Sequence, residues 1–394
     1  MNESMTVALY DLSPALRLML LGITLALGPL AWVWLRNKQR PPAQRLAALT
    51  ALTLFLTFDL VLFGAFTRLT DSGLGCPDWP GCYGQASPVG ARAQISAAEA
   101  ALPSGPVTHT KAWIEMIHRY LASGVGVLIL TIAAVSVLRR RELPVHPGWP
   151  LFTLAWVCLQ GAFGALTVTL RLTPAIVTLH LLGGLILLAL LCRQAVTYSQ
   201  AYRPRPPWAV SPALRTALGL GFGLLWLQVA LGGWVSTNDA VLACNEFPKC
   251  QGSWWPPMDW RQGFELWRPL GMTSGGEPVT FAALTAIHYL HRLMAYLLLP
   301  VLAALAWQLH RAGYSRGALW LAGLAAWQLG TGLTNVALEW PLLAAVSHTG
   351  GSAGLVVVFT WILCEVRQRR TVTAAEGGMR TAGAGALAAQ EARP

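Results

Sequence analysis

Two stretches of this 394-residue sequence decide its architecture: GAFTRLTDSGLGCPDWPGCYG at residues 64–84 and GGWVSTNDAVLACNEFPKCQG at residues 232–252. In each stretch an aspartate precedes two cysteines, and a proline lies between those cysteines. Cys76 corresponds to Cys244 and Cys82 to Cys250, and both differences are 168 positions (244 − 76 and 250 − 82). Chance similarity between apolar helices does not match Cys, Pro and Asp at one offset, so the chain contains an internal duplication.

The duplication extends through polar residues that lie inside apolar segments. The matched residues are Gln160 and Gln328, His180 and His348, and, at an offset of 173, the pairs His118-Arg119 and His291-Arg292. The larger offset reflects a longer loop in the second copy. The sequence therefore predicts two similar units in tandem.

The composition predicts a membrane protein. Hydrophobic residues make up 55% of the chain and charged residues 11%, whereas about a quarter of the residues of a soluble domain are charged. Apolar runs of the roughly 20 residues that a helix needs to cross a bilayer recur along the chain. Their unbroken character indicates helices, because the strands of a membrane barrel alternate. The net charge of +11 does not predict nucleic-acid binding, because the basic residues lie in short segments between apolar runs.

Nine spans are predicted, with bounds that the pattern defines only to a few residues. They are 16–35, 46–68, 113–138, 149–170, 176–192, 212–235, 281–310, 318–338 and 342–366. Arg and Lys gather in every second connection, and such loops face the cytoplasm. We therefore expect a multi-pass protein of the cell inner (cytoplasmic) membrane, with its N-terminus outside and its C-terminus in the cytoplasm.

The predicted fold class is an all-α polytopic membrane protein with two tandem four-helix bundles and one extra N-terminal helix. An even number of spans in each unit gives both copies the same orientation. The expected division is 1–44 for the extra transmembrane helix and a cytoplasmic linker, 45–192 for the first bundle, 193–211 for a cytoplasmic linker, 212–366 for the second bundle and 367–394 for a disordered cytoplasmic tail.

Four histidines carry the chemistry that we predict. His118, His180, His291 and His348 lie inside spans, within about three turns of the outer end. Two imidazoles on separate helices of a bundle can bind a haem iron from both faces. Zinc is less favoured, because no thiolate converges with them. The alternative is a set of histidines that form hydrogen bonds across helices or line a pore.

Charged residues accompany the first histidine of each pair. Arg119 and Arg292 could each pair with a haem propionate or extend to the outer surface. Glu115 lies three residues before His118, on the same helical face, and its counterpart is His288. A carboxylate at this place could move protons or stabilise developing charge, or could pair with the neighbouring arginine.

The four cysteines of the repeated stretches lie just outside the predicted membrane. In an oxidising compartment, Cys76–Cys82 and Cys244–Cys250 are expected to form disulfides. They could accept electrons or clasp the loops structurally, and both interpretations stay open.

The sequence resembles the haem A synthase family over about residues 45–366. The resemblance rests on TRLTDSGLGC at 67–76, on Asp78-Trp79-Pro80 ahead of Cys82, on Glu115-x-x-His118-Arg119 and on the repeated histidines. It implies an oxidoreductase that oxidises the C8 methyl of haem O to a formyl group through successive hydroxylations, which makes haem A for terminal oxidases.

The resemblance also implies roles for individual residues. The first half would hold the substrate haem O, with His118 and His180 as ligands and Glu115 as the catalytic carboxylate. The second half would hold a resident haem b between His291 and His348. The haem O synthase is a candidate partner and membrane lipid is the expected surrounding, while the electron donor is not identified and a homo-oligomer is left open. The helix before residue 46 and the extra imidazole of the second half depart from the simplest family pattern.

Two other functions are compatible with part of this pattern. A membrane b-type cytochrome with paired histidines that only transfers electrons explains the four histidines equally well. It does not explain why Glu115 is replaced by His288 in the second copy, nor the paired cysteines. A transporter built from a parallel repeat would bind no haem.

Overall fold

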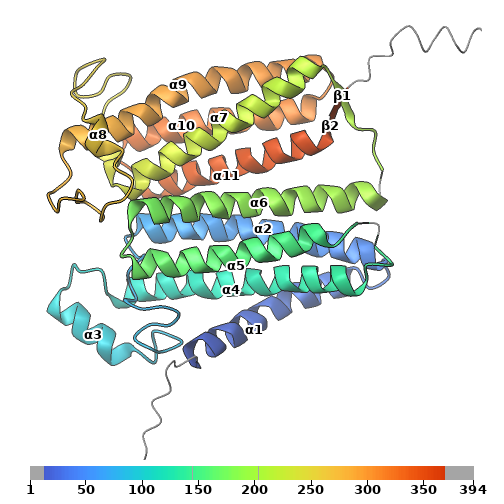
Figure 1. Ribbon diagram of the computed structural model, residues 1–394, viewed down its shortest axis with the longest axis horizontal. Helices are drawn as coiled ribbons and strands as arrows, with labels where there is room; N and C mark the ends of the chain where they lie inside the picture. Colours follow the sequence, from blue (N-terminus) through green and yellow to red (C-terminus); the bar gives the residue numbers. More distant parts are fainter. Residues whose placement is uncertain (1–12, 144, 203, 369–394) are drawn as a thin grey trace, which may run out of the picture.

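The computed structural model describes residues 13–368 except 144 and 203, and in this part of the chain nine long helices run along a common direction (Figure 1). They are α1 (Ser13–Arg36), α2 (Pro42–Leu69), α4 (His109–Leu138), α5 (Gly148–Thr169), α6 (Pro174–Tyr202), α7 (Pro212–Thr237), α9 (Phe281–Arg311), α10 (Ser315–Ala337) and α11 (Leu342–Glu365). Within the described residues, eight are long and apolar enough to cross a membrane, and α10 is the less apolar exception. The prediction of an all-α polytopic membrane protein is confirmed.

The long helices pack as two sets of four. Helices α2, α4, α5 and α6 contact one another in the first half, and α7, α9, α10 and α11 do so in the second. The halves meet where α6 packs against α7 and α11, and where α2 packs against α11. The additional helix, α1, lies at the edge of the molecule beside α4 (Figure 1). This arrangement gives each half its own interior.

The backbone repeats with the spacing of the sequence. Non-glycine residues rarely adopt a positive φ angle, because their Cβ atom then crowds the backbone. Matched positive angles nevertheless occur at positions 168 apart: Asp71 and Asp239, Tyr83 and Gln251, Arg171 and Glu339, and Leu172 and Trp340. The two copies therefore share the shapes of their turns as well as their helices.

One end of the molecule carries the two cysteine-containing connections, and we call it the disulfide end. These connections contain three short helices that the sequence did not predict: α3 (Arg92–Ala101), η1 (Ala240–Leu242) and α8 (Trp260–Gly263). Hydrogen bonds join the halves there, and one of them runs from Arg68 to the Ser236 carbonyl oxygen at 2.8 Å. Arg68 pairs with Asp239, and the hydroxyl groups of Thr178 and Thr237 lie 3.0 Å apart.

The opposite end differs from the predicted linkers. Helix α6 continues to Tyr202, ten residues past its predicted end. The extension is stabilised by Tyr198, which is buried and lies 3.1 Å from the Ser136 hydroxyl. The strands β1 (Trp208–Val210) and β2 (Val366–Gln368) then pair in parallel. The predicted tail 367–394 lies outside the described residues except for its first two, and the orientation of the termini stays a prediction.

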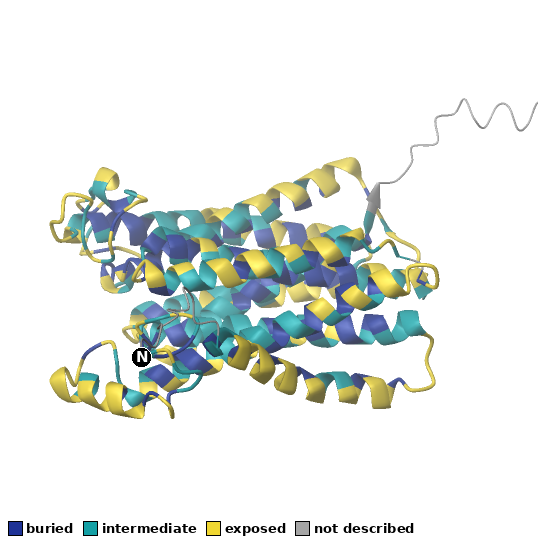
Figure 2. Ribbon diagram, turned by 60° about the horizontal axis from the view of Figure 1, so that its bottom comes forward, coloured by how far each residue is buried: buried dark blue, intermediate teal, exposed yellow. Residues whose placement is uncertain are grey.

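Exposed residues lie along the sides of the helices (Figure 2), and many of them are large and apolar. Leu20, Leu220 and Leu319 are 63%, 67% and 73% exposed. A soluble protein rarely presents so much contiguous apolar surface to water. This surface is suited to lipid, as expected for a multi-pass protein of the cell membrane.

Candidate functional site

The four predicted histidines lie on four different helices at one level of the molecule. His118 and His291 follow the first residues of α4 and α9 by nine and ten positions, and His180 and His348 follow those of α6 and α11 by six. At 1.5 Å per residue, all four lie about 9–15 Å from the helix ends at the disulfide end.

Each imidazole lies against a glycine of a neighbouring helix. The contacts are Gly64 with His118, Gly164 with His180, Gly232 with His291, and Gly332 with His348. A Cβ atom at these glycines would lie 3.0, 3.5, 2.9 and 3.4 Å from the nearest ring atom, respectively. The glycines obey the repeat, since Gly64 and Gly232, and Gly164 and Gly332, are 168 positions apart. That shared offset was the sequence signal that could have identified them.

The histidines form one pair in each half. His118 and His180 lie on α4 and α6 of the first half, and His291 and His348 lie on α9 and α11 of the second. All four side chains are only half-buried although they lie between packed helices.

Nearer the opposite end, by contrast, Leu188, Leu191 and Phe359 are completely buried. Paired imidazoles beside glycines fit the demands of a haem iron with two axial ligands. Within the described residues, no group of three or more His, Cys, Asp or Glu side chains suits a directly bound metal ion.

In the second half, both imidazoles have a side-chain partner. The Nδ1 atom of His348 lies 2.9 Å from the Thr331 hydroxyl oxygen. Because that hydroxyl donates its own proton to the Trp327 carbonyl at 2.8 Å, it can accept one from Nδ1–H. The Nδ1 atom of His291 lies 3.1 Å from the side-chain amide nitrogen of Gln228. These contacts fix the ring orientations.

The first half lacks both restraints. Leu60 and Phe163 occupy the positions that correspond to Gln228 and Thr331. The Nδ1 atom of His180 is buried and has no hydrogen-bond partner among the described residues. The two histidine pairs therefore differ in how firmly the protein orients them.

Glu115 is almost completely buried at 4% exposure. One carboxylate oxygen accepts a hydrogen bond from the backbone N–H of Cys76 at 2.7 Å, and the other pairs with Arg119. The carboxylate thus connects α4, one turn from His118, to the first disulfide loop.

His288 occupies the corresponding place in the second half. Its Nδ1 atom lies 3.1 Å from the Ala240 carbonyl oxygen, and Arg292 donates from Nε to its other ring nitrogen at 3.3 Å. An imidazole thus replaces the carboxylate in the same structural role, and of these two corresponding positions the one in the first half holds the acid.

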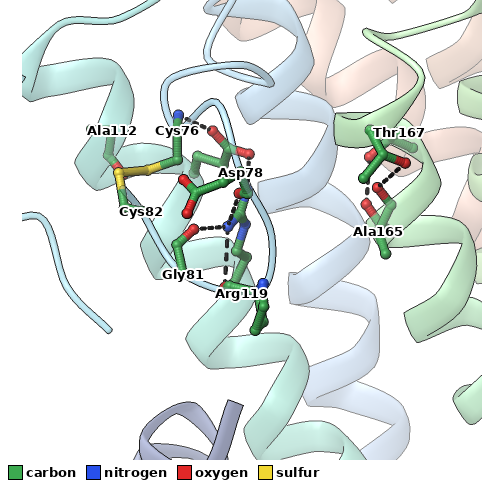
Figure 3. Close-up of polar contacts among 12 residues, drawn as sticks. Cys76, Asp78, Gly81, Cys82, Ala112, Arg119, Ala165 and Thr167 are labelled. Carbon is green, nitrogen blue, oxygen red and sulfur yellow. Dashed lines mark hydrogen bonds and ion pairs between the residues drawn. A yellow bond between two sulfur atoms is a disulfide. The ribbon is translucent and has the colours of Figure 1, made fainter. Parts of the chain in front are cut away.

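Arg119 and Arg292 hold the disulfide loops. Arg119 extends from α4 into the first loop and donates to the carbonyl oxygens of Asp78, Pro80 and Gly81 (Figure 3). Arg292 donates in the same way to the carbonyl oxygens of three residues of the second loop: Cys244, Glu246 and Lys249. We predicted that these two arginines pair with haem propionates. Only the guanidinium N–H groups that do not already bind loop carbonyls are available for that pairing.

Both expected disulfides are formed. Cys76 bonds to Cys82 and Cys244 to Cys250, and all four cysteines are inaccessible to solvent. The first loop is also braced by the Asp78 carboxylate, which accepts from two backbone N–H groups of the same loop at 2.6 and 2.7 Å. These contacts stabilise the disulfide loops, and redox activity of the cysteines stays a prediction.

One buried residue at the disulfide end was missed. Arg268 lies in the longer second loop, is 2% exposed and donates to the Asn238 side-chain oxygen at 2.6 Å. Neither repeat offset places an arginine at its counterpart in the first half, so the duplication could not point to it.

Together, these features define a duplicated, all-helical membrane protein with one pair of histidines in each bundle, a class suited to haem. The family described as cytochrome oxidase assembly protein matches residues 47–360. The chain is 36% identical to "Heme A synthase" of Shewanella oneidensis over 322 residues, which cover 81% of this chain and 96% of that protein. It is 30% identical to "Heme A synthase" of a Bradyrhizobium species, over 80% of this chain and 89% of that protein. A third relative of the same name, from Halalkalibacterium halodurans, is 25% identical over 78% of this chain and 91% of that protein. The chain belongs to the haem A synthase family.

Proposed function

We propose that this protein makes haem A by oxidising the C8 methyl group of haem O to a formyl group through successive hydroxylations. The observation that carries the proposal is the combination of a histidine pair in each bundle with a buried acid, Glu115, at the first pair only. The family relationship supports a role in haem A biosynthesis. The two unequal sites support a division between a substrate haem and a resident haem.

The first half is the proposed substrate site. His118 and His180 would hold the iron of haem O. Because neither ring is fixed by a side-chain hydrogen bond within the described part of the chain, the pair is suited to a haem that enters as haem O and leaves as haem A. The positions that correspond to Gln228 and Thr331 hold the apolar residues Leu60 and Phe163, which match the largely apolar haem.

The second half is the proposed site of haem b, with His291 and His348 as ligands. Haem b bound there would supply one-electron transfer to the first site. Hydrogen bonds from a ligand's second ring nitrogen fix its orientation and raise its basicity. The hydrogen bond that Nδ1–H of His348 can donate to Thr331 therefore supports a permanently bound haem in this half.

Glu115 is the proposed catalytic acid–base. Its carboxylate is held in place by the Cys76 N–H and by Arg119, one helical turn from His118. General acid–base groups must lie at a fixed place beside the reacting centre. We propose that a Glu115 carboxylate oxygen accepts or delivers a proton as the methyl group is oxidised.

Variants of the acid test this assignment. Glu115→Gln keeps the side-chain shape, and Glu115→Ala removes the group. In cells that make haem O, both should retain the low-spin b-type spectrum while haem A per protein falls to background. Glu99→Gln, which changes a carboxylate of the same connection that contacts His109, is the matched control and should behave as wild type. Normal haem A production by both Glu115 variants would remove this residue from the mechanism.

The second pair has its own test. His291→Ala and His348→Ala should each lose the low-spin b-type signal. An unchanged spectrum would mean that haem b is bound elsewhere.

A further inference from the structure

The connection between α7 and α9 buries a cation that forms no ion pair with a described carboxylate. Arg268 is 2% exposed, and only its Nη2 group has a partner, the Asn238 side-chain oxygen. Its Nε and Nη1 atoms are also buried, and no described residue offers them an acceptor. A buried guanidinium with unsatisfied N–H groups is energetically costly, so this geometry is expected where an anion binds.

The neighbouring carboxylates are engaged elsewhere. Glu265 accepts hydrogen bonds from the backbone N–H of Ser274 at 3.3 and 3.4 Å. Asp239 pairs with Arg68. Burial lowers the pKa of Arg268, and the charge of Glu265 offsets this effect only in part. An arginine nevertheless stays protonated at neutral pH, so the positive charge persists.

Arg268 lies on the disulfide-end side of the second histidine pair. Asn238 ends α7, six residues beyond Gly232, the glycine that contacts His291. The distance along the helix is about 9 Å toward the disulfide end. The indole N–H of Trp234 donates to the Gly263 carbonyl at 2.9 Å and holds the Arg268-containing loop against α7.

We propose that Arg268, held in place by the side-chain oxygen of Asn238, forms a carboxylate-binding site for a propionate of the haem held by His291 and His348. The inference rests on the proposed function of the second half. Both propionates of a haem leave one edge of the macrocycle, and that polar edge is expected to face the nearer aqueous end, which here is the disulfide end. The planar guanidinium of arginine matches a carboxylate better than any other side chain. This site takes the role that the sequence had suggested for Arg292.

A comparison of haem b with its dimethyl ester tests the carboxylate site directly, because the ester keeps the iron and the ring but lacks both carboxylates. The full chain, purified without haem, is titrated with each compound, and binding is followed by the low-spin absorption band. Wild type should prefer haem b by about tenfold or more, as expected for a charge-assisted hydrogen bond. Arg268→Gln should reduce this preference about tenfold, and Arg268→Lys should retain part of it. The exposed Arg261, changed to Gln, is the control in the same connection and should match wild type.

Unfolding temperatures show whether Arg268 is merely structural. Without haem, Arg268→Gln should unfold at the same temperature as wild type or higher, because an unpaired buried charge has been removed. A lower temperature without haem, together with an unchanged preference for haem b over the ester, would assign Arg268 a structural role only. Equal discrimination by Arg268→Gln and wild type, with a normal spectrum, would overturn the propionate site alone, and a carboxylate from lipid would then be the remaining partner. A wild-type protein that binds neither compound would refute the haem b assignment itself, and both proposals with it.

Discussion

The glycines beside the histidines allow us to predict how an added methyl group changes haem binding, because the four glycines lie at different distances from their imidazole rings. In Gly232→Ala, the new Cβ atom would lie 2.9 Å from the His291 Cε1 atom, whereas ordinary contact begins at 3.4 Å. The imidazole must therefore move by about 0.5 Å, which equals the tolerance of a well-built site. A change in the residues that orient a metal ligand typically reduces the affinity for the metal by about 10- to 100-fold. We expect a loss of about 1.4–3 kcal/mol in the free energy of haem b binding.

Gly332→Ala is the matched control. Its Cβ atom would lie 3.4 Å from the His348 ring, an ordinary contact, so haem b binding should change little. Alanine is also a better helix former than glycine by about 1 kcal/mol, so neither variant should lower the unfolding temperature of the haem-free protein.

The assay is haem b per polypeptide after purification, with a titration of the haem-free protein. Normal haem b binding by Gly232→Ala, or an equal loss of binding in Gly332→Ala, would refute the steric reasoning. The first half offers the same comparison for haem O: Gly64→Ala, at 3.0 Å from His118, should lose binding, and Gly164→Ala, at 3.5 Å from His180, should keep it.

Three further predictions concern the supports of the sites. Thr331→Val should raise the midpoint potential of haem b, because the lost hydrogen bond makes its ligand less basic, whereas Thr331→Ser should not; a redox titration with equal potentials would contradict this. Replacement of Cys244 and Cys250 by serine should reduce the free energy of unfolding by about 2 kcal/mol, since the disulfide closes a short loop; an unchanged unfolding temperature would argue that the other loop contacts suffice. Arg68→Ala should cost less than about 1 kcal/mol, because its partner Asp239 is 63% exposed; a salt-independent loss of several kcal/mol would show that this ion pair holds the halves together.

The sequence was sufficient to predict the nine long helices, although α10 is less apolar than a membrane span requires. The position of His118 within its apolar run indicates how deep it lies, and the repeat indicates that His291 shares its level. Helix ends were less predictable. The prediction ended α6 near Cys192 because polar residues follow. Arg193 instead lies over the Trp149 ring at 4.3 Å, and the helix continues.

Contacts between helices could not be predicted from the sequence, because periodicity does not say which residues of two helices meet. The glycine facing each imidazole follows from packing, although Gly64 and Gly232 share the repeat offset. Thr331 and Gln228 were missed for the same reason. The propionate role of the arginines after His118 and His291 stays a prediction, and the carbonyl groups that they hold become neighbours only when the loops fold back over the helices.

The most direct test of the central claim is the identity of the haems that the purified protein carries. The protein is produced in cells that make haem O, and its haems are extracted, separated by reversed-phase chromatography and identified by mass spectrometry. We predict haem A, or a hydroxylated haem O, together with haem B. Haem B alone, with haem O available, would contradict the proposed synthesis of haem A and indicate a cytochrome that only transfers electrons.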